Sequence, residues 1–165
     1  MRAATGPIQF RELDALWARL AVVRAEAVLG AWRGFVFPTG HPVEGVLERS
    51  RWHGKHFLAL DDAKPLICRA GDGSLYSDTA GGRGEASLWN VEFRGEVTAT
   101  MVYDGMPVLD HFKQLDEGTL MGVMNGKRAG APAAGRLLYF GLEREWHARA
   151  FTPPSPVSRL PDLEF

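Results

Sequence analysis

The stretch that decides the fold is EVTATMVYDGMPVLDHFK, residues 96–113. Two runs rich in β-branched and aromatic side chains, 96–103 and 106–113, flank the pair Asp104-Gly105. An aspartate followed by a glycine accepts the backbone angles of a two-residue hairpin turn, and such runs are typical of half-buried strands. The stretch therefore predicts a β-hairpin, in which Tyr103 lies opposite Met106, Met101 opposite Val108, and Ala99 opposite Asp110.

A second hairpin precedes the first, because residues 87–93 and 96–103 flank Arg94-Gly95. Residues that lie opposite each other on neighbouring strands share a face. One face of these three strands is therefore predicted to carry Leu88, Asn90, Val97, Ala99, Met101, Tyr103, Met106, Val108, Asp110 and Phe112. We expect this face to point inward, because it mixes flexible methionines and aromatic rings with a few polar groups, as ligand cavities do.

Turn signals divide the rest of the chain into further short strands. We expect them at 31–37, 66–69, 74–77, 119–125 and 136–143. Successive hairpins form a meander, and a long meander closes on itself to remove its edges. The predicted fold class is mainly β, a closed antiparallel β-barrel of about eight to ten strands whose lumen holds one small ligand. A β-sandwich is the alternative, but its crossovers need longer connections.

The first part of the chain predicts one or two helices. An apolar stripe of helical spacing comprises Phe10, Leu13, Leu16, Trp17 and Leu20. Residues 22–29 continue this helix or form a second short one, and residues 43–51 form one or two helical turns. The aromatic stretch 52–57 receives no assignment. Whether the first helix covers the barrel mouth as a lid or fills its base as a plug stays open.

Composition limits the class of protein. The chain has 165 residues, 45% of them hydrophobic, and a formal net charge of −1. We expect one globular domain without affinity for nucleic acid or acidic membranes. We expect no signal peptide, no membrane-spanning segment and a cytoplasmic location. The lone Cys68 forms no internal disulfide and is expected to be a buried strand residue.

Several blocks of the sequence resemble a known family. Gly30-Ala31-Trp32-Arg33-Gly34 is followed by Pro38-Thr39-Gly40-His41-Pro42 and by Trp52-His53-Gly54-Lys55-His56-Phe57. These blocks resemble the bacterial GXWXG-protein family. The later blocks Met101-Val102-Tyr103-Asp104, Asp110-His111-Phe112 and Met121-Gly122-Val123-Met124 are similar to the uncharacterised domain that accompanies it. We expect a single domain over 1–165, with the first module at about 28–85, its companion at about 86–145 and a loose tail at 153–165.

A helix followed by a strand with Gly-x-Trp is distantly similar to lipocalins and fatty-acid-binding proteins. This resemblance implies a carrier that binds a small hydrophobic molecule, such as a fatty acid or another lipid, without a cofactor. The residues predicted to bind it are Trp32, Arg33, Trp52, Leu88, Asn90, Ala99, Met101, Tyr103, Val108, Asp110, Phe112, Met121, Met124 and Tyr139. An ionised Asp110 in the lumen repels a carboxylate ligand unless Arg33 or another cation lies between them, which favours a neutral ligand or a hydroxyl or carbonyl head group.

Three alternatives stay open. The motif also resembles haem-binding nitrobindin barrels, in which case His111 or His147 is the axial ligand. A small enzyme of the isomerase or hydrolase kind would use His111 with Asp104 or Asp110, although neighbouring residues point to opposite faces of a strand. We assign no catalytic residue and no metal site, since His53 and His56 lack a third well-spaced ligand. The third alternative is a scaffold or interaction domain without a small ligand, in which exposed apolar groups such as Trp89 and Leu109 form a homodimer interface.

Overall fold

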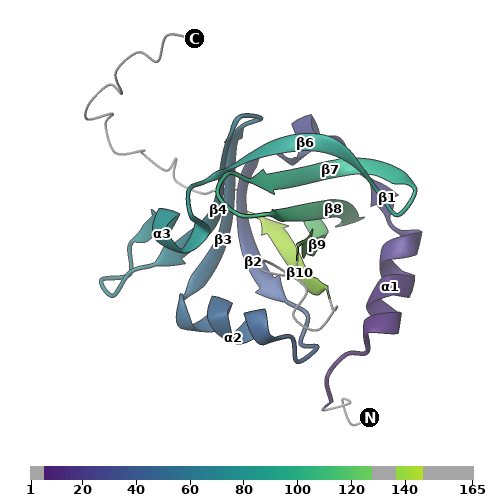
Figure 1. The fold of residues 1–165 in the computed structure, drawn as a ribbon, viewed down its shortest axis with the longest axis horizontal. Coiled ribbons are helices and arrows are strands. Elements are labelled where there is room, and N and C mark those ends of the chain that lie inside the picture. The colour runs from purple at the N-terminus through teal and green to yellow at the C-terminus, as the bar shows by residue number, and fades with distance from the viewer. Residues whose placement is uncertain (1–5, 128–136, 147–165) are drawn as a thin grey trace.

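The computed structural model describes residues 6–127 and 137–146 (Figure 1). Its helices are α1 (Phe10–Arg19), the 3-10 helix η1 (Ala25–Val28), α2 (Pro42–Arg49) and α3 (Thr79–Gly82). Its strands are β1 (Ala21–Val22), β2 (Gly30–Val36), β3 (Trp52–Ala59), β4 (Asp62–Arg69), β5 (Leu75–Ser77), β6 (Ala86–Phe93), β7 (Glu96–Tyr103), β8 (Val108–Asp116), β9 (Thr119–Gly126) and β10 (Leu138–Arg144). No helix within these residues is long and apolar enough to cross a membrane.

Eight of the strands form a closed antiparallel barrel, which confirms the predicted fold class. Each strand pairs with the next in the order β2-β3-β4-β6-β7-β8-β9-β10, and β10 returns to β2. The short β1 adds to β8, and β5 adds to β4. Closure pairs the unsatisfied edges that an open meander leaves. Because β2 needs β10 and β8 needs β9, strands from both halves of the chain are required to close the barrel.

The face that we expected to point inward does so. Leu88 lies opposite Met101 and Asn90 opposite Ala99, as predicted. The interior cluster contains most of that face, including Leu88, Ala99, Met101, Tyr103, Val108 and Phe112. Val97, near the start of β7, is the exception, because it is 55% exposed. Alternation along the strands therefore identified the interior correctly from sequence.

The predicted pairing of β7 with β8 is wrong by two residues. Met101 lies opposite Asp110, and the strands are joined by the four residues 104–107 instead of Asp104-Gly105 alone. Pro107 has no backbone N–H to donate to a ladder, so β8 begins only at Val108. A shift of two residues keeps every side chain on its predicted face.

One end of the barrel is closed by η1. Ala25 and Val28 are buried against the interior cluster, and the indole N–H of Trp32 donates to the Val28 carbonyl at 2.8 Å. The Asn90 side chain accepts a hydrogen bond from the Ala25 backbone N–H at 2.9 Å. The Arg144 guanidinium lies over the Trp32 ring, 4.2 Å from its centroid. Trp32 thus seals this end of the barrel instead of contacting a ligand.

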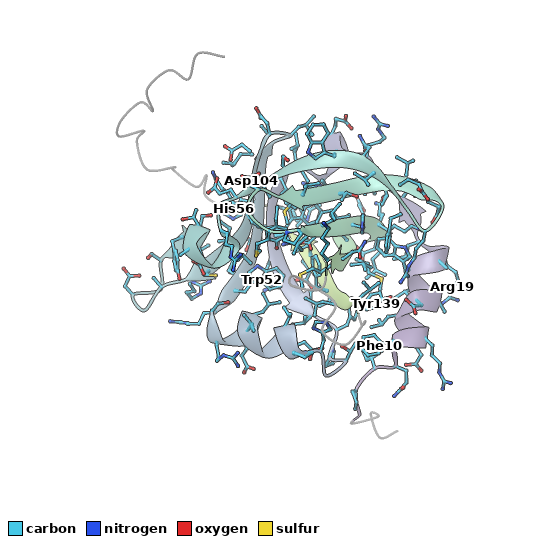
Figure 2. All side chains as sticks on the ribbon, viewed as in Figure 1. Phe10, Arg19, Trp52, His56, Asp104 and Tyr139 are labelled. Carbon is cyan, nitrogen blue, oxygen red and sulfur yellow. The ribbon has the colours of Figure 1, made fainter. Side chains whose placement is uncertain are left out.

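The helix α1 is neither lid nor plug, because it packs on the outer wall of the barrel (Figure 1). Its apolar stripe buries Leu13 and Trp17 against residues of β9 and β10, namely Met121, Val123 and Tyr139. Phe10 meets the Tyr139 ring at a centroid distance of 6.4 Å (Figure 2). A capping box between Gln9 and Glu12 begins the helix.

Two segments differ from their sequence-based expectations. The unassigned aromatic stretch 52–57 belongs to β3, whose pairing with β4 contains register shifts on both sides of Gly54. These irregularities break the alternation by which a strand is recognised. The glycine-rich segment after β5, for which the sequence predicts neither helix nor strand, contains the one-turn helix α3, and the Asp78 side chain caps it by accepting from the Gly81 N–H.

Gly34, the second glycine of the motif, is required because the Trp52 ring lies directly against its backbone. A Cβ atom at residue 34 would lie 2.2 Å from Cη2 of Trp52, whose indole packs on β2. We expect Gly34→Ala to lower the free energy of unfolding by about 1–3 kcal/mol, since overpacking displaces the ring. Gly71→Ala is the control, because a Cβ there meets nothing within 4 Å, and its effect stays within about 0.5 kcal/mol. Equal urea midpoints for the two variants would contradict this account.

Candidate ligand-binding site

A pocket enters the barrel at the end opposite η1. Because β2 starts at the η1 end and β3 runs antiparallel to it, the start of β3 lies at the other end. The helix α2 connects β2 to β3 and so lies at this second end (Figure 1). The apolar lining consists of Leu47, Trp52, Leu66, Met124, Leu138 and Phe140. The polar lining consists of Lys55, Tyr103 and Asp110.

A buried ion pair lies in this pocket. Nζ of Lys55 is 2.8 Å from Oδ2 of Asp110, and the two side chains are only 3% and 1% exposed. The ammonium also donates to the Pro65 carbonyl at 3.2 Å. It lies 5.2 Å from the Phe140 ring centroid and 5.5 Å from that of Trp52. Removing two charges from water costs several kcal/mol per ion. The contacts of the ammonium with the carboxylate, the carbonyl and the aromatic rings offset that cost.

The carboxyl of Asp110 has an unused acceptor. Its Oδ1 is buried and has no hydrogen-bond partner among the described residues. Burial raises the pKa of Asp110, while the Lys55 ammonium and the nearby Tyr103 hydroxyl oppose that rise. Burial, together with the charge of Asp110, raises the pKa of Tyr103 well above its ordinary value. Leaving a buried acceptor without a donor costs about 1–3 kcal/mol, so Oδ1 favours a donor, either the neighbouring Tyr103 hydroxyl after a small shift or a group on a pocket molecule.

The structure brings together only part of the set predicted from sequence. Trp52, Tyr103, Asp110 and Met124 line the pocket. Behind them, the closed interior of the barrel contains Trp32, Leu88, Ala99, Met101, Val108 and Phe112. These six residues fill the lumen instead of lining the open pocket.

Four predicted residues lie elsewhere. Met121 and Tyr139 face outward beneath α1. Side chains alternate between the two faces of a strand, and the neighbours Leu120 and Phe140 point inward. Arg33 is on the outer surface and pairs with Glu143, so it does not separate Asp110 from a ligand. Asn90 uses its side-chain oxygen to hold η1.

Sequence reasoning missed five residues of the pocket lining, of which Lys55 is the charged one; the others are Leu47, Leu66, Leu138 and Phe140. The negative charge of Asp110 indicated that a cation lies nearby, but the predicted cation was Arg33. The signal was present in Trp52-His53-Gly54-Lys55-His56-Phe57, where Lys55 and Phe57 share a face if the stretch is a strand. The register shifts next to Gly54 hid that strand.

His111 does not reach the pocket. It lies on the outer wall, stacked on Phe93 at a centroid distance of 4.0 Å, and its Nδ1 and Nε2 contact Thr100 at 2.9 Å and Asn125 at 3.3 Å. This position does not fit a histidine that ligates haem inside the lumen. Asp110 points to the opposite face of β8, so His111 and Asp110 do not form an acid–base pair. His147 is outside the described residues. Within the described chain, no group of three metal-ligating side chains is present.

The ion pair predicts a large cost when only one partner is removed. Lys55→Met leaves the Asp110 carboxylate buried without its cation, so we expect the free energy of unfolding to fall by about 3–5 kcal/mol. The double variant Lys55→Met/Asp110→Leu replaces both charges with apolar groups and recovers most of this loss. Urea denaturation measures both. A loss below about 1 kcal/mol for Lys55→Met is typical of solvent-exposed pairs and would show that the pair is hydrated.

His111 predicts a stability that depends on pH. Burial, with a smaller effect of the Arg94 charge, lowers its pKa from 6.5 to about 4. Between these values the unfolded chain binds a proton that the folded chain does not, so stability falls as the pH falls through this window. We expect a loss of about 2–3 kcal/mol between pH 7 and pH 4 from this residue. In His111→Phe, which does not titrate, the same denaturation series should be flatter by that amount, and equal slopes would refute the assignment.

Comparisons with known proteins agree with this architecture. Residues 15–73 match the family described as GXWXG protein, and residues 84–144 match a domain of unknown function, DUF4334. A crystal structure of a protein from Thermomonospora curvata is 37% identical, with a TM-score of 0.75. The match covers 84% of this chain and 89% of that chain. No curated protein matches. The chain therefore belongs to the GXWXG protein family, and its second half is the companion domain DUF4334.

Proposed function

We propose that the barrel binds a small, mainly apolar molecule that carries a hydrogen-bond donor such as a hydroxyl group. The observation that carries this proposal is the buried Oδ1 of Asp110, which lacks a partner although Asp110 lines a pocket of mainly aliphatic and aromatic side chains. An apolar wall with a few oriented polar groups is the usual composition of a small-molecule site.

The charges favour a neutral ligand over a carboxylate. Lys55 is the cation beside Asp110, but the two already neutralise each other at 2.8 Å. A carboxylate that enters the pocket therefore meets a second carboxylate without a spare cation, since Arg33 is on the outer surface. An alcohol instead donates to Oδ1 and completes its hydrogen bonding.

The space favours a short ligand. The pocket contains about 250 Å³ outside the protein atoms, and this volume includes solvent at its mouth. The part that side chains enclose is far smaller and has room for about one water molecule, so a ligand enters by displacing flexible side chains. Deeper in the lumen, Phe57, Met101 and Phe112 are fully buried against one another in the core. A ligand therefore occupies the mouth of the barrel, where Met124 and Leu47 have side chains that adapt to its shape.

The isomers 1-hexanol and methyl pentyl ether test the donor requirement, because only the alcohol has an O–H. We expect 1-hexanol to bind about tenfold more tightly, in line with a hydrogen bond to a charged group. Isothermal titration calorimetry measures both. Equal affinities would refute a role for Oδ1, and the absence of binding by either molecule would refute the proposed function.

Two variants on α2 test the location of the site. Leu47 lines the pocket, whereas its neighbour Val46 is 51% exposed and is not part of it. Leu47→Trp fills the mouth and should weaken 1-hexanol binding by at least about tenfold. Val46→Trp adds the same ring to the same helix and should leave the affinity unchanged.

A further inference from the structure

We infer that Lys55 forms a reversible imine with small apolar aldehydes and ketones that enter the pocket. This inference rests on the proposed function, because it requires the same pocket to admit an apolar molecule. The inference adds a covalent reaction to the proposed function. It also adds aldehydes and ketones to the ligands, since the site would react with a carbonyl carbon as well as bind a hydrogen-bond donor.

The first argument is the position of the amine. Lys55 is the lysine in the pocket lining, and its Nζ is surrounded by the Trp52, Tyr103 and Phe140 rings at 5.2–5.7 Å. Apolar surroundings exclude water, which otherwise competes with the amine for the carbonyl group and hydrolyses the product. A desolvated lysine in such a pocket is the usual nucleophile for a carbonyl substrate.

The second argument is the acid beside the amine. Asp110 lies 2.8 Å from Nζ, so its carboxylate is placed to take a proton from the Lys55 ammonium when a carbonyl compound reaches the amine. Because burial raises the pKa of Asp110, this transfer costs less than it would in water. The transfer leaves the total charge of the pocket unchanged.

The chemistry balances without a further reactant. The neutral amine attacks the carbonyl carbon to form a C–N bond, and the carbonyl oxygen takes the proton held by Asp110. Asp110 then removes a proton from the attached nitrogen and returns it to the hydroxyl group, so that the C–O bond breaks and water leaves. The product is an iminium cation at Lys55 with the Asp110 carboxylate as its counterion. Overall, an ammonium and an aldehyde become an iminium and one water.

Other lysines provide internal controls. Lys64 is also ion-paired, with Asp62 and Glu85, but it is on the outer surface with a side chain that is 14% exposed. Lys113 is fully buried beside Glu96 and the Trp17 carbonyl, on the α1 side of the barrel wall. Lys127 is exposed, and none of these three lysines belongs to the pocket lining. All three ion-paired lysines contact a carboxylate, so this contact does not single out Lys55. Lys55 differs from Lys64 and Lys113 because a molecule in the pocket can reach its amine.

The experiment is reductive trapping of the full chain with hexanal and sodium cyanoborohydride, followed by intact mass and peptide mapping. We expect one major adduct, on Lys55. Lys64→Arg should retain it and Lys55→Arg should lose it, while excess 1-hexanol should slow its formation. Lys55→Arg keeps a cation beside Asp110, and circular dichroism checks its fold. If that variant does not fold, the wild-type map decides, because Lys55 must be labelled faster than Lys64, Lys113 and the exposed Lys127.

The outcomes separate the two proposals. If 1-hexanol binds but Lys55 is labelled no faster than the other lysines, the imine inference is wrong and the proposed function stands. If neither 1-hexanol nor hexanal binds, both proposals are wrong. Labelling of Lys55 that 1-hexanol does not slow would also overturn the inference, because the reaction would then occur outside the proposed pocket.

Discussion

The ion pair between Lys55 and Asp110 is the interaction on which the organisation of the pocket end depends. Its partners lie on β3 and β8, which are four strands apart in the ring of eight and therefore on opposite walls of the barrel. The pair thus connects the two walls through the lumen. Two charges persist at 3% and 1% exposure only with added partners, which here are the Pro65 carbonyl and surrounding rings. These requirements determine which side chains surround the pocket.

The two ends of the barrel have different chemistry for a physical reason. At the η1 end, the Trp32 indole N–H donates to the Val28 carbonyl and the Arg144 guanidinium covers the indole ring, so this end is sealed and its polar groups are paired. At the α2 end, the buried pair leaves Oδ1 of Asp110 without a donor beside a pocket. On the outer wall, α1 covers β9 and β10 without entering the lumen. Binding is therefore proposed at the α2 end alone.

Sequence reasoning identified part of this site and could not identify the rest. It placed Asp110 on the inward face and recognised that its charge needs a cation, because alternation on β6 to β8 was regular. It assigned that role to Arg33, which pairs with Glu143 on the outer surface. Lys55 was missed because the register shifts next to Gly54 obscure the strand that carries it. Tyr139 and Met121 were misplaced because no regular hairpin fixed which of their faces points inward.

The sequence by itself determined the fold class, the inward face of the β6–β8 hairpins and the family, because these follow from local periodicity, turn residues and short motifs. The tertiary structure alone decided which cation neutralises Asp110, where α1 packs and how far the lumen is filled. These features depend on contacts between residues far apart in the chain, such as Lys55 with Asp110 and Trp17 with Met121. Closing the barrel brings opposite strands together, and no local pattern records which side chains then meet.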